Sequence, residues 1–308
     1  MVTLCPERSA PGPQQTPDAG VGRRPLWRRE LGLIAFGYFL YTITRNAAPP
    51  HVAMAHHHAT AVLSVERWLH VDIELTLNHL LTGHRLIGAM ASYYYATLHF
   101  IVTLGVLVWV YRRHPTGYRQ ARTLLVGTTL VALFLFWVYP LAPPRLSGLG
   151  FVDTVGTVRL WGGVTWNSPG VASVSNEFAA MPSLHVAWAL WSAGMILRFS
   201  RHRVIRRIAL LYPVITLCVV LATANHFVLD AVGAAAVLGV VVAAQMLASQ
   251  RRAQGGLAVL AAQVRNILQS GNAQTAQTAS QRQLVIPTGR LDRQLTCDDR
   301  ARSGEMTR

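Results

Sequence analysis

The hydrophobic pattern of the chain divides it into long apolar runs separated by short polar links. Six runs cover residues 31–49, 86–111, 124–139, 181–199, 208–224 and 226–248. Each comes near the length of about 20 residues with which an α-helix crosses a bilayer. The sequence therefore predicts an all-α fold, a polytopic membrane helical bundle with about six transmembrane helices.

Polar segments flank and interrupt this predicted bundle. Residues 1–30 form a basic tail, residues 31–250 the six-span membrane domain and residues 251–308 a cytoplasmic tail. The tails are too polar to bury a core, so we expect disorder there, apart from a short amphipathic helix over 256–268. Residues 50–85 mix apolar and ionisable positions irregularly, which predicts an interfacial helix or a solvated loop.

Composition supports a membrane protein. Apolar residues make up 52% of the 308 residues and charged residues only 13%, with a mean hydropathy of +0.31, which is unlike a soluble domain. All 28 basic residues are arginines, and the formal net charge is +15. They form short clusters between the apolar runs instead of one basic face, so nucleic acid is not an expected partner. The three cysteines form no framework of disulfides or zinc ligands.

The arginine clusters also predict an orientation. They lie in the amino-terminal tail, in the second-to-third and fourth-to-fifth links, and after the sixth run. Cytoplasmic loops are enriched in arginine, so both termini are predicted to be cytoplasmic in a multi-pass protein of the cell membrane. The end of the third run and the starts of the fourth and sixth then share the extracytoplasmic side.

Two motifs at these outer ends are suited to binding phosphate. In Ala142–Arg145, prolines end the third run and hold Arg145 at the membrane surface. In Phe178–His185, a proline suits the first position of a helix whose free amides would form an anion site beside Ser183 and His185. The alternative is a proline-started helix that binds nothing.

A third motif, Asn225–Asp230, opens the sixth run. His226 and Asp230 are four residues apart and share one face of a helix, where a carboxylate can orient an imidazole and raise its basicity. Ionisable residues inside a membrane span are costly and usually functional. The alternative is a buried pair that only holds helices together.

The three motifs together contain the groups needed for phosphoryl transfer without a metal or cofactor. One histidine can attack phosphorus while the other protonates the departing oxygen, and Arg145 matches phosphate oxygens with its fork of donors. The consecutive residues His56, His57 and His58 cannot all face one metal from a regular helix. We therefore predict no metal site, and the role of these three histidines stays open.

These motifs resemble those of the type 2 phosphatidic acid phosphatase superfamily, and within it the inositol phosphorylceramide synthase-like, or inositolphosphotransferase, branch. The resemblance implies that His226 is a nucleophile that forms a phosphohistidine, with Asp230 as its orienting partner. It further implies that His185 is the acid for the leaving group and that Ser183 and Arg145 contact the phosphate.

The chain departs from the broad superfamily in three ways. It has no lysine, Val220 stands six residues before His226 where an arginine is usual, and Leu184 replaces a glycine. These departures match the synthase-like branch better than the generic lipid phosphatases. They also leave few cations for phosphate, with Arg159 as a further candidate.

The sequence thus predicts an integral membrane phosphotransferase or lipid phosphate phosphatase. It would act on a lipid or polyprenyl phosphate ester at the outer face, with membrane lipids as partners. The motifs do not specify the lipid, the acceptor (water or an alcohol) or the oligomeric state. Two alternatives stay open: a proton-coupled transporter that uses the same His and Asp residues as a relay, and an inactive membrane scaffold.

Overall fold

The computed structural model describes residues 25–47, 52–154 and 178–283. These residues form helices and no β-strand, apart from one isolated parallel bridge between Leu141 and Ala179. The predicted all-α fold is therefore confirmed. The chain consists of two compact units, Met1–Gln245 and Met246–Arg308.

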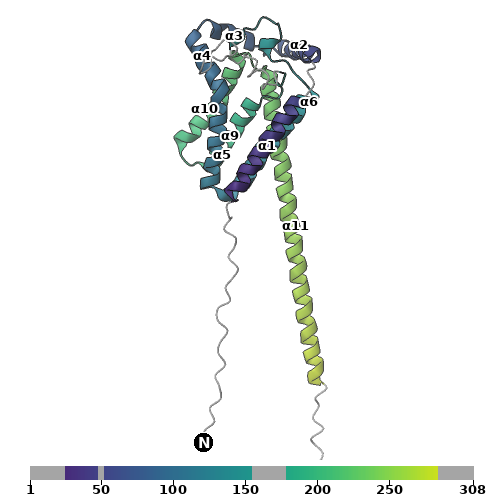
Figure 1. Cartoon of the computed structure of the whole chain (residues 1–308). Coiled ribbons are helices and arrows are strands. Elements are labelled where there is room, and N and C mark those ends of the chain that lie inside the picture. The colour runs from purple at the N-terminus through teal and green to yellow at the C-terminus, as the bar shows by residue number, and fades with distance from the viewer. Residues whose placement is uncertain (1–24, 48–51, 155–177, 284–308) are drawn as a thin grey trace, which may run out of the picture. The chain divides into compact units, whose positions relative to one another are not determined.

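The first unit holds almost all of the helices. In chain order they are α1 (Trp27–Ala47), α2 (Val52–Leu69), α3 (Glu74–Thr82), α4 (Arg85–Tyr93), the π-helical turn η1 (Tyr94–Leu98), α5 (His99–Arg113), α6 (Pro115–Val138), the 3-10 turn η2 (Pro144–Leu146), α9 (Leu184–Phe199), α10 (Arg203–Ala222) and the first part of α11 (Val228–Gln283). Figure 1 shows α5, α6, α9 and α10 as a bundle, with α2 and α3 across one end of it.

Several of these helices identify a membrane protein. Four helical segments are long and apolar enough to cross a bilayer: Arg85–Arg113, Pro115–Val138, Arg203–Ala222 and Val228–Gln277. The predicted count of six is not confirmed. Helix α9 has 16 residues, or about 24 Å at 1.5 Å per residue, which is shorter than the hydrocarbon core of about 30 Å. Helix α1 has 21 residues, but charged residues occur near both of its ends.

The bundle interior lies where α5, α6 and α9 meet. Its largest buried side chains are Trp191 and Tyr118, packed among Val106, Leu107, Val110, Ala121, Leu125 and Met195. The Trp191 indole N–H donates to the Ala121 carbonyl at 3.0 Å, which satisfies its one donor inside the core. The Tyr118 hydroxyl donates to Glu30, which also pairs with Arg122, so α1 is attached to α6 through buried polar groups.

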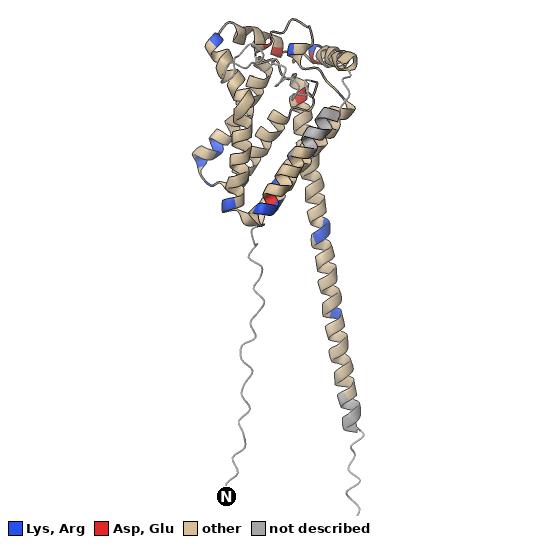
Figure 2. Ribbon diagram, in the orientation of Figure 1, with Lys and Arg blue, Asp and Glu red and all other residues tan. Residues whose placement is uncertain are grey.

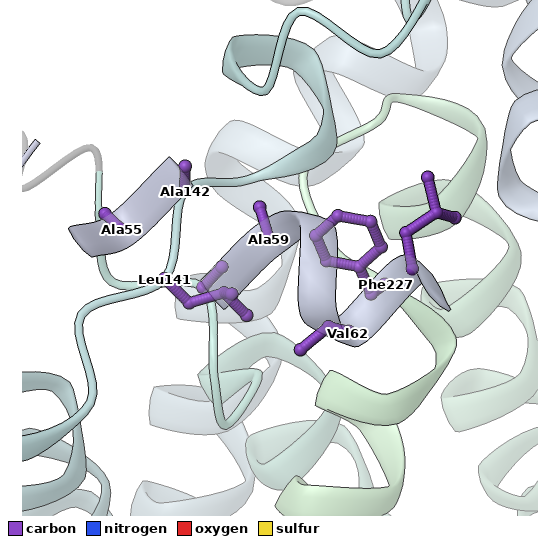
Figure 3. Close-up of a cluster of buried hydrophobic side chains, with 8 residues drawn as sticks. Ala55, Ala59, Val62, Leu141, Ala142 and Phe227 are labelled. Carbon is purple, nitrogen blue, oxygen red and sulfur yellow. The ribbon is translucent and has the colours of Figure 1, made fainter. Parts of the chain in front are cut away.

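Helix α2 packs against the three motif-bearing segments. Figure 3 shows Ala55, Ala59 and Val62 of α2 beside Leu141, Ala142 and Phe227. The small side chains let the two backbones come close enough for a direct hydrogen bond. The Ala142 amide donates to the Ala55 carbonyl at 3.2 Å. The mixed segment 50–85 is therefore not a solvated loop but two helices with a buried face, since its small apolar residues recur every three or four positions.

Two helix ends differ from the expectation. Helix α9 begins at Leu184, not at Pro182, because Ser183 is the N-cap and its side chain accepts from the Val186 amide. Helix α11 continues to Gln283 instead of giving way to a separate helix over 256–268 and a disordered remainder. The segment has no proline and many alanine, glutamine and leucine residues, which favour helix.

Some sequence-based expectations fall outside the described residues. These are the structure of the segments 1–24, 155–177 and 284–308, together with the placement of Arg159. The arginines of the described links can be placed. Figure 2 shows those of 112–122 and 201–207 toward the end of the first unit that is away from α2 and α3.

Candidate active site

The three motifs found in the sequence meet in the structure, next to α2. Backbone hydrogen bonds join the motifs or the residues directly beside them: Leu141 N to Phe178 O at 2.8 Å, Arg145 N to Ala224 O at 2.9 Å and Ser183 N to Asp230 O at 3.1 Å. Each motif is thus held against the other two by main-chain groups, which fixes the site more firmly than side-chain contacts alone.

His226 and Asp230 form a buried pair. The Nδ1 atom of His226 lies 2.9 Å from the Ala180 carbonyl oxygen and 3.2 Å from Oδ2 of Asp230. A carbonyl oxygen can only accept, so Nδ1 carries a proton and Nε2 of the neutral ring has a free lone pair. Within the described part of the chain, Nε2 is buried and has no hydrogen-bond partner. Oδ2 of Asp230 also accepts from the Phe227 amide at 2.8 Å.

His185 lies beside this pair. Its ring centroid is 5.7 Å from that of His226. The ring stacks on Tyr95 at 4.1 Å, and its Nε2–H donates to the Tyr95 carbonyl at 3.2 Å. This bond fixes the tautomer and makes Nδ1 the nitrogen that can exchange a proton with a substrate.

Sequence reasoning missed the partners of His185. Tyr95 belongs to the π-helical turn η1, and His99, whose ring centroid is 4.0 Å from that of His185, begins α5. The sequence signal for this neighbour was His99 itself. It is an ionisable residue within a long apolar run, where such residues are usually functional. A π-helical turn has no local sequence signature, although such turns are frequent at functional sites.

Arg145 is held beside the residue that precedes His226. Its Nε–H donates to Oδ1 of Asn225 at 3.0 Å, and an Nη1–H donates to Oδ2 of Asp153 at 3.3 Å. The side chain is largely buried. Asp153 and Asn225 were not predicted as Arg145 partners, because the first contact spans an irregular loop and the second spans 80 residues.

Ser183 is fully buried at the start of α9. Its Oγ accepts from the Val186 amide at 3.4 Å, so the hydroxyl caps the helix in this arrangement. Ala224 turns the chain toward His226 with a φ of 52°, a conformation that costs a non-glycine residue about 1–2 kcal/mol. The bond from Arg145 N to Ala224 O helps to hold that turn.

Two buried glutamates lie behind the pair. Glu66 on α2 and Glu74 on α3 are both 0% exposed, and the Leu229 amide donates to Oε1 of Glu66 at 2.6 Å. Burial, together with the neighbouring carboxyls of Glu74 and Asp230, raises the pKa of Glu66 to about 9. In the sequence, both glutamates belong to the mixed segment 50–85, for which an interfacial helix or a solvated loop is predicted. The spacing of Glu66 from Ala59 and Val62, which places it on the apolar face of α2, was the available signal.

His58 contributes to the packing of the first motif. Its Nδ1–H donates to the Pro140 carbonyl at 2.8 Å, and its ring stacks on Tyr139 at 4.0 Å. The ring of His56 lies edge-on to that of Phe178 in the second motif, with the ring centroids 6.2 Å apart. Across the described ranges, no group of three or more His, Cys, Asp or Glu side chains is arranged to hold a metal.

The match to a protein family agrees with these motifs. The model of the PAP2 superfamily matches residues 60–244, more than half of the chain, and includes all three motifs. The chain belongs to the PAP2 superfamily. Its members are generally phosphatases or phosphotransferases, so this is a membrane enzyme of that type acting on phosphate esters. No curated protein and no solved structure matches the chain significantly.

Proposed function

We propose that this protein transfers or hydrolyses the phosphoryl-linked group of a lipid or polyprenyl phosphate ester through a phosphohistidine on His226. The observation that carries the proposal is the tautomer of His226. Its Nδ1–H is committed to Ala180 and Asp230, and its buried Nε2 has a lone pair and no partner in the described residues. A histidine nucleophile needs this arrangement.

The reaction proceeds in two steps. In the first, Nε2 of His226 attacks phosphorus, the N–P bond forms, the P–O bond to the leaving group breaks, and His185 donates a proton to the departing oxygen. In the second, water or an alcohol attacks phosphorus and gives its proton to His185, and the N–P bond breaks. The Nδ1 proton of His226 stays in place, and Asp230 stabilises the positive charge that the ring carries while it is phosphorylated.

Phosphate binding falls to Arg145 and to the start of α9. Two of the five N–H donors of Arg145 are used by Asn225 and Asp153, which leaves others for phosphate oxygens. The first amides of α9 and the positive end of its dipole favour an anion beside His185. The Ser183 hydroxyl would then keep its cap and donate its proton to a phosphate oxygen.

Features of the chain support the inositolphosphotransferase-like branch and a metal-independent reaction. Val220 is buried among Val186, Ala187 and Ala234, so the position of the usual arginine carries no cation here. His226, His185 and Asp230 supply nucleophile, acid and orienting carboxylate, which makes the route complete without a metal. The arginines toward the far end of the unit support an extracytoplasmic site with both termini inside.

The test compares His226→Ala and His185→Ala on an activated aryl phosphate ester and on an alkyl ester. His226→Ala should abolish leaving-group release and the trapping of base-stable phosphohistidine after an alkaline quench with both esters. His185→Ala should lose activity mainly on the alkyl ester, by about 10²–10⁴-fold, because an aryl oxide departs without an acid. The matched control is His202→Ala, at the exposed start of α10, which should leave both rates unchanged.

The substrate class is determined in the same assay with labelled phospholipids and polyprenyl phosphates, with and without an alcohol acceptor. Phosphoenzyme in His226→Ala, or equal losses for His185→Ala on both esters, would contradict the assigned roles. Histidine-dependent proton flux in proteoliposomes without ester cleavage would support the transporter alternative instead.

A further inference from the structure

Glu66 and Glu74 present an unusual combination of burial and missing donors. Both are fully buried, and their carboxyl groups are within hydrogen-bond reach of each other. The Leu229 amide donates to Oε1 of Glu66, whereas Oε2 of Glu66 and both oxygens of Glu74 receive no donor from the described residues. Two ionised carboxylates cannot bond to each other, because neither has a hydrogen to donate.

We propose that Glu66 and Glu74 share one proton and that this acid pair positions His226 and Asp230. With one proton the pair forms an O–H···O bond across α2 and α3 and carries a single negative charge instead of two. The inference rests on the proposed function of His226 and Asp230. Glu66 and Glu74 are positioning residues, since they reach the reacting atoms only through α11.

The contact with Leu229 links the pair to the site. Leu229 is the second residue of α11 and directly precedes Asp230, so a 2.6 Å bond from its amide to Glu66 fixes the first turn of that helix. The side chain of Leu229 also packs against the buried cluster formed by α2 and the motifs. A displacement of about 1 Å at a reacting group can cost about 10²-fold in rate, so this anchor affects turnover.

Charge makes the anchor sensitive to the shared proton. The acidic groups that face Glu66 are Glu74 from α3 and Asp230 from α11. Arg67, next to Glu66 in α2, pairs with Asp72 at 3.9 Å on the surface and does not neutralise the pair. Loss of the shared proton would therefore place a second negative charge in the buried pair near Asp230, and the repulsion would displace α2 and α3 from the start of α11.

The resulting pH dependence lies in the alkaline range. Burial and the neighbouring carboxyls raise the pKa of Glu66 to about 9, so Glu66 keeps its proton at neutral pH and loses it above about pH 9. Tyr139 is the other group near Asp230 that titrates at alkaline pH, and burial raises the pKa of its hydroxyl above the ordinary value. Tyr139→Phe therefore separates its ionisation from that of the glutamates.

The kinetic test measures kcat against pH for wild type, Glu66→Gln and Glu74→Gln. Each glutamine supplies an N–H donor and removes one ionisable carboxyl, so both variants should retain most of kcat near pH 7 and lose the alkaline decrease. Glu66→Ala removes the acceptor for Leu229 and should lower kcat by about 10²-fold at neutral pH. Asp72→Asn, which removes an exposed carboxylate from the same segment, is the matched control and should keep the wild-type profile.

A second measurement needs no turnover and remains valid if Glu66→Ala does not fold. The infrared difference spectrum of wild type minus Glu66→Gln, near pH 7, should contain the C=O band of a protonated carboxylic acid, and that band should disappear above about pH 9. A missing band, or an unchanged alkaline decrease in both glutamine variants, would overturn the proposal. Failure of the proposed function would be visible separately, as wild type without phosphohistidine or as an active His226→Ala variant.

Discussion

Asp230→Asn separates the charge of the Asp230 side chain from its hydrogen bonds. Both bonds accepted by the carboxylate go to Oδ2, from His226 Nδ1 at 3.2 Å and from the Phe227 amide at 2.8 Å. Oδ1 has no partner within the described ranges. An asparagine whose oxygen takes the place of Oδ2 keeps both bonds and puts its NH2 group where Oδ1 was. The substitution therefore removes a negative charge with little change in packing.

The size of the effect follows from the distance between the charges. At an effective dielectric constant of about 20, unit charges 3.2 Å apart attract by about 5 kcal/mol. The positive charge of a phosphorylated imidazole is spread over the ring, so we expect about 3–4 kcal/mol of lost stabilisation in the transition state. That loss corresponds to a decrease in kcat of about 10²–10³-fold.

The assay is the single-turnover rate of phosphohistidine formation after a rapid alkaline quench, measured beside the melting temperature in detergent. Asp230→Asn should form phosphohistidine slowly while melting at or above the wild-type temperature, because a buried charge has been removed. Asp72→Asn serves as the surface control. A folded Asp230→Asn enzyme with the wild-type rate would refute the role assigned to the charge, and a loss explained by unfolding would refute the claim that the hydrogen bonds are kept.

Three further predictions concern stability. Gly117→Ala would bring Cβ within 2.7 Å of Cε1 of Phe199. The substitution should therefore lower the free energy of unfolding by about 1–3 kcal/mol without changing kcat. An unchanged melting temperature would contradict this. Glu30→Ala removes a buried carboxylate and leaves the partly buried Arg122 without its partner, so it should cost about 1–3 kcal/mol, measured by denaturation in detergent. Glu30→Gln should be milder because it keeps an acceptor. The pKa of Glu66 is about 9 in the folded protein against an ordinary 4.5, so folding retains a proton that the unfolded chain releases between these values. Stability should therefore fall as pH rises from about 5 to about 9, by at most about 1.4 kcal/mol per pH unit, and an equal slope in Glu66→Gln would argue against the shifted group.

Local sequence patterns determined the helical fold and the identity of the motifs. Apolar runs of helix length and arginine-rich links are properties of consecutive residues, so they indicate a membrane bundle without knowledge of its packing. The candidate residues His185, His226 and Asp230 were found because each motif contains its chemistry within eight residues or fewer. Hydropathy was less able to count spans, since it does not show where a helix such as α9 begins.

Tertiary packing decided what surrounds those residues. The carbonyl that fixes the tautomer of His226 belongs to Ala180, 46 residues away, and the carboxyl that anchors Leu229 belongs to Glu66, 163 residues away. No local period connects such positions. From the sequence alone, Glu66 belongs to a segment that is predicted to be an interfacial helix or a solvated loop. Whether a glutamate is solvated or buried depends on which helix covers it, and so do its proton and its partners. The sequence determined which groups are available for chemistry, whereas the folded structure alone decided their contacts and charge states.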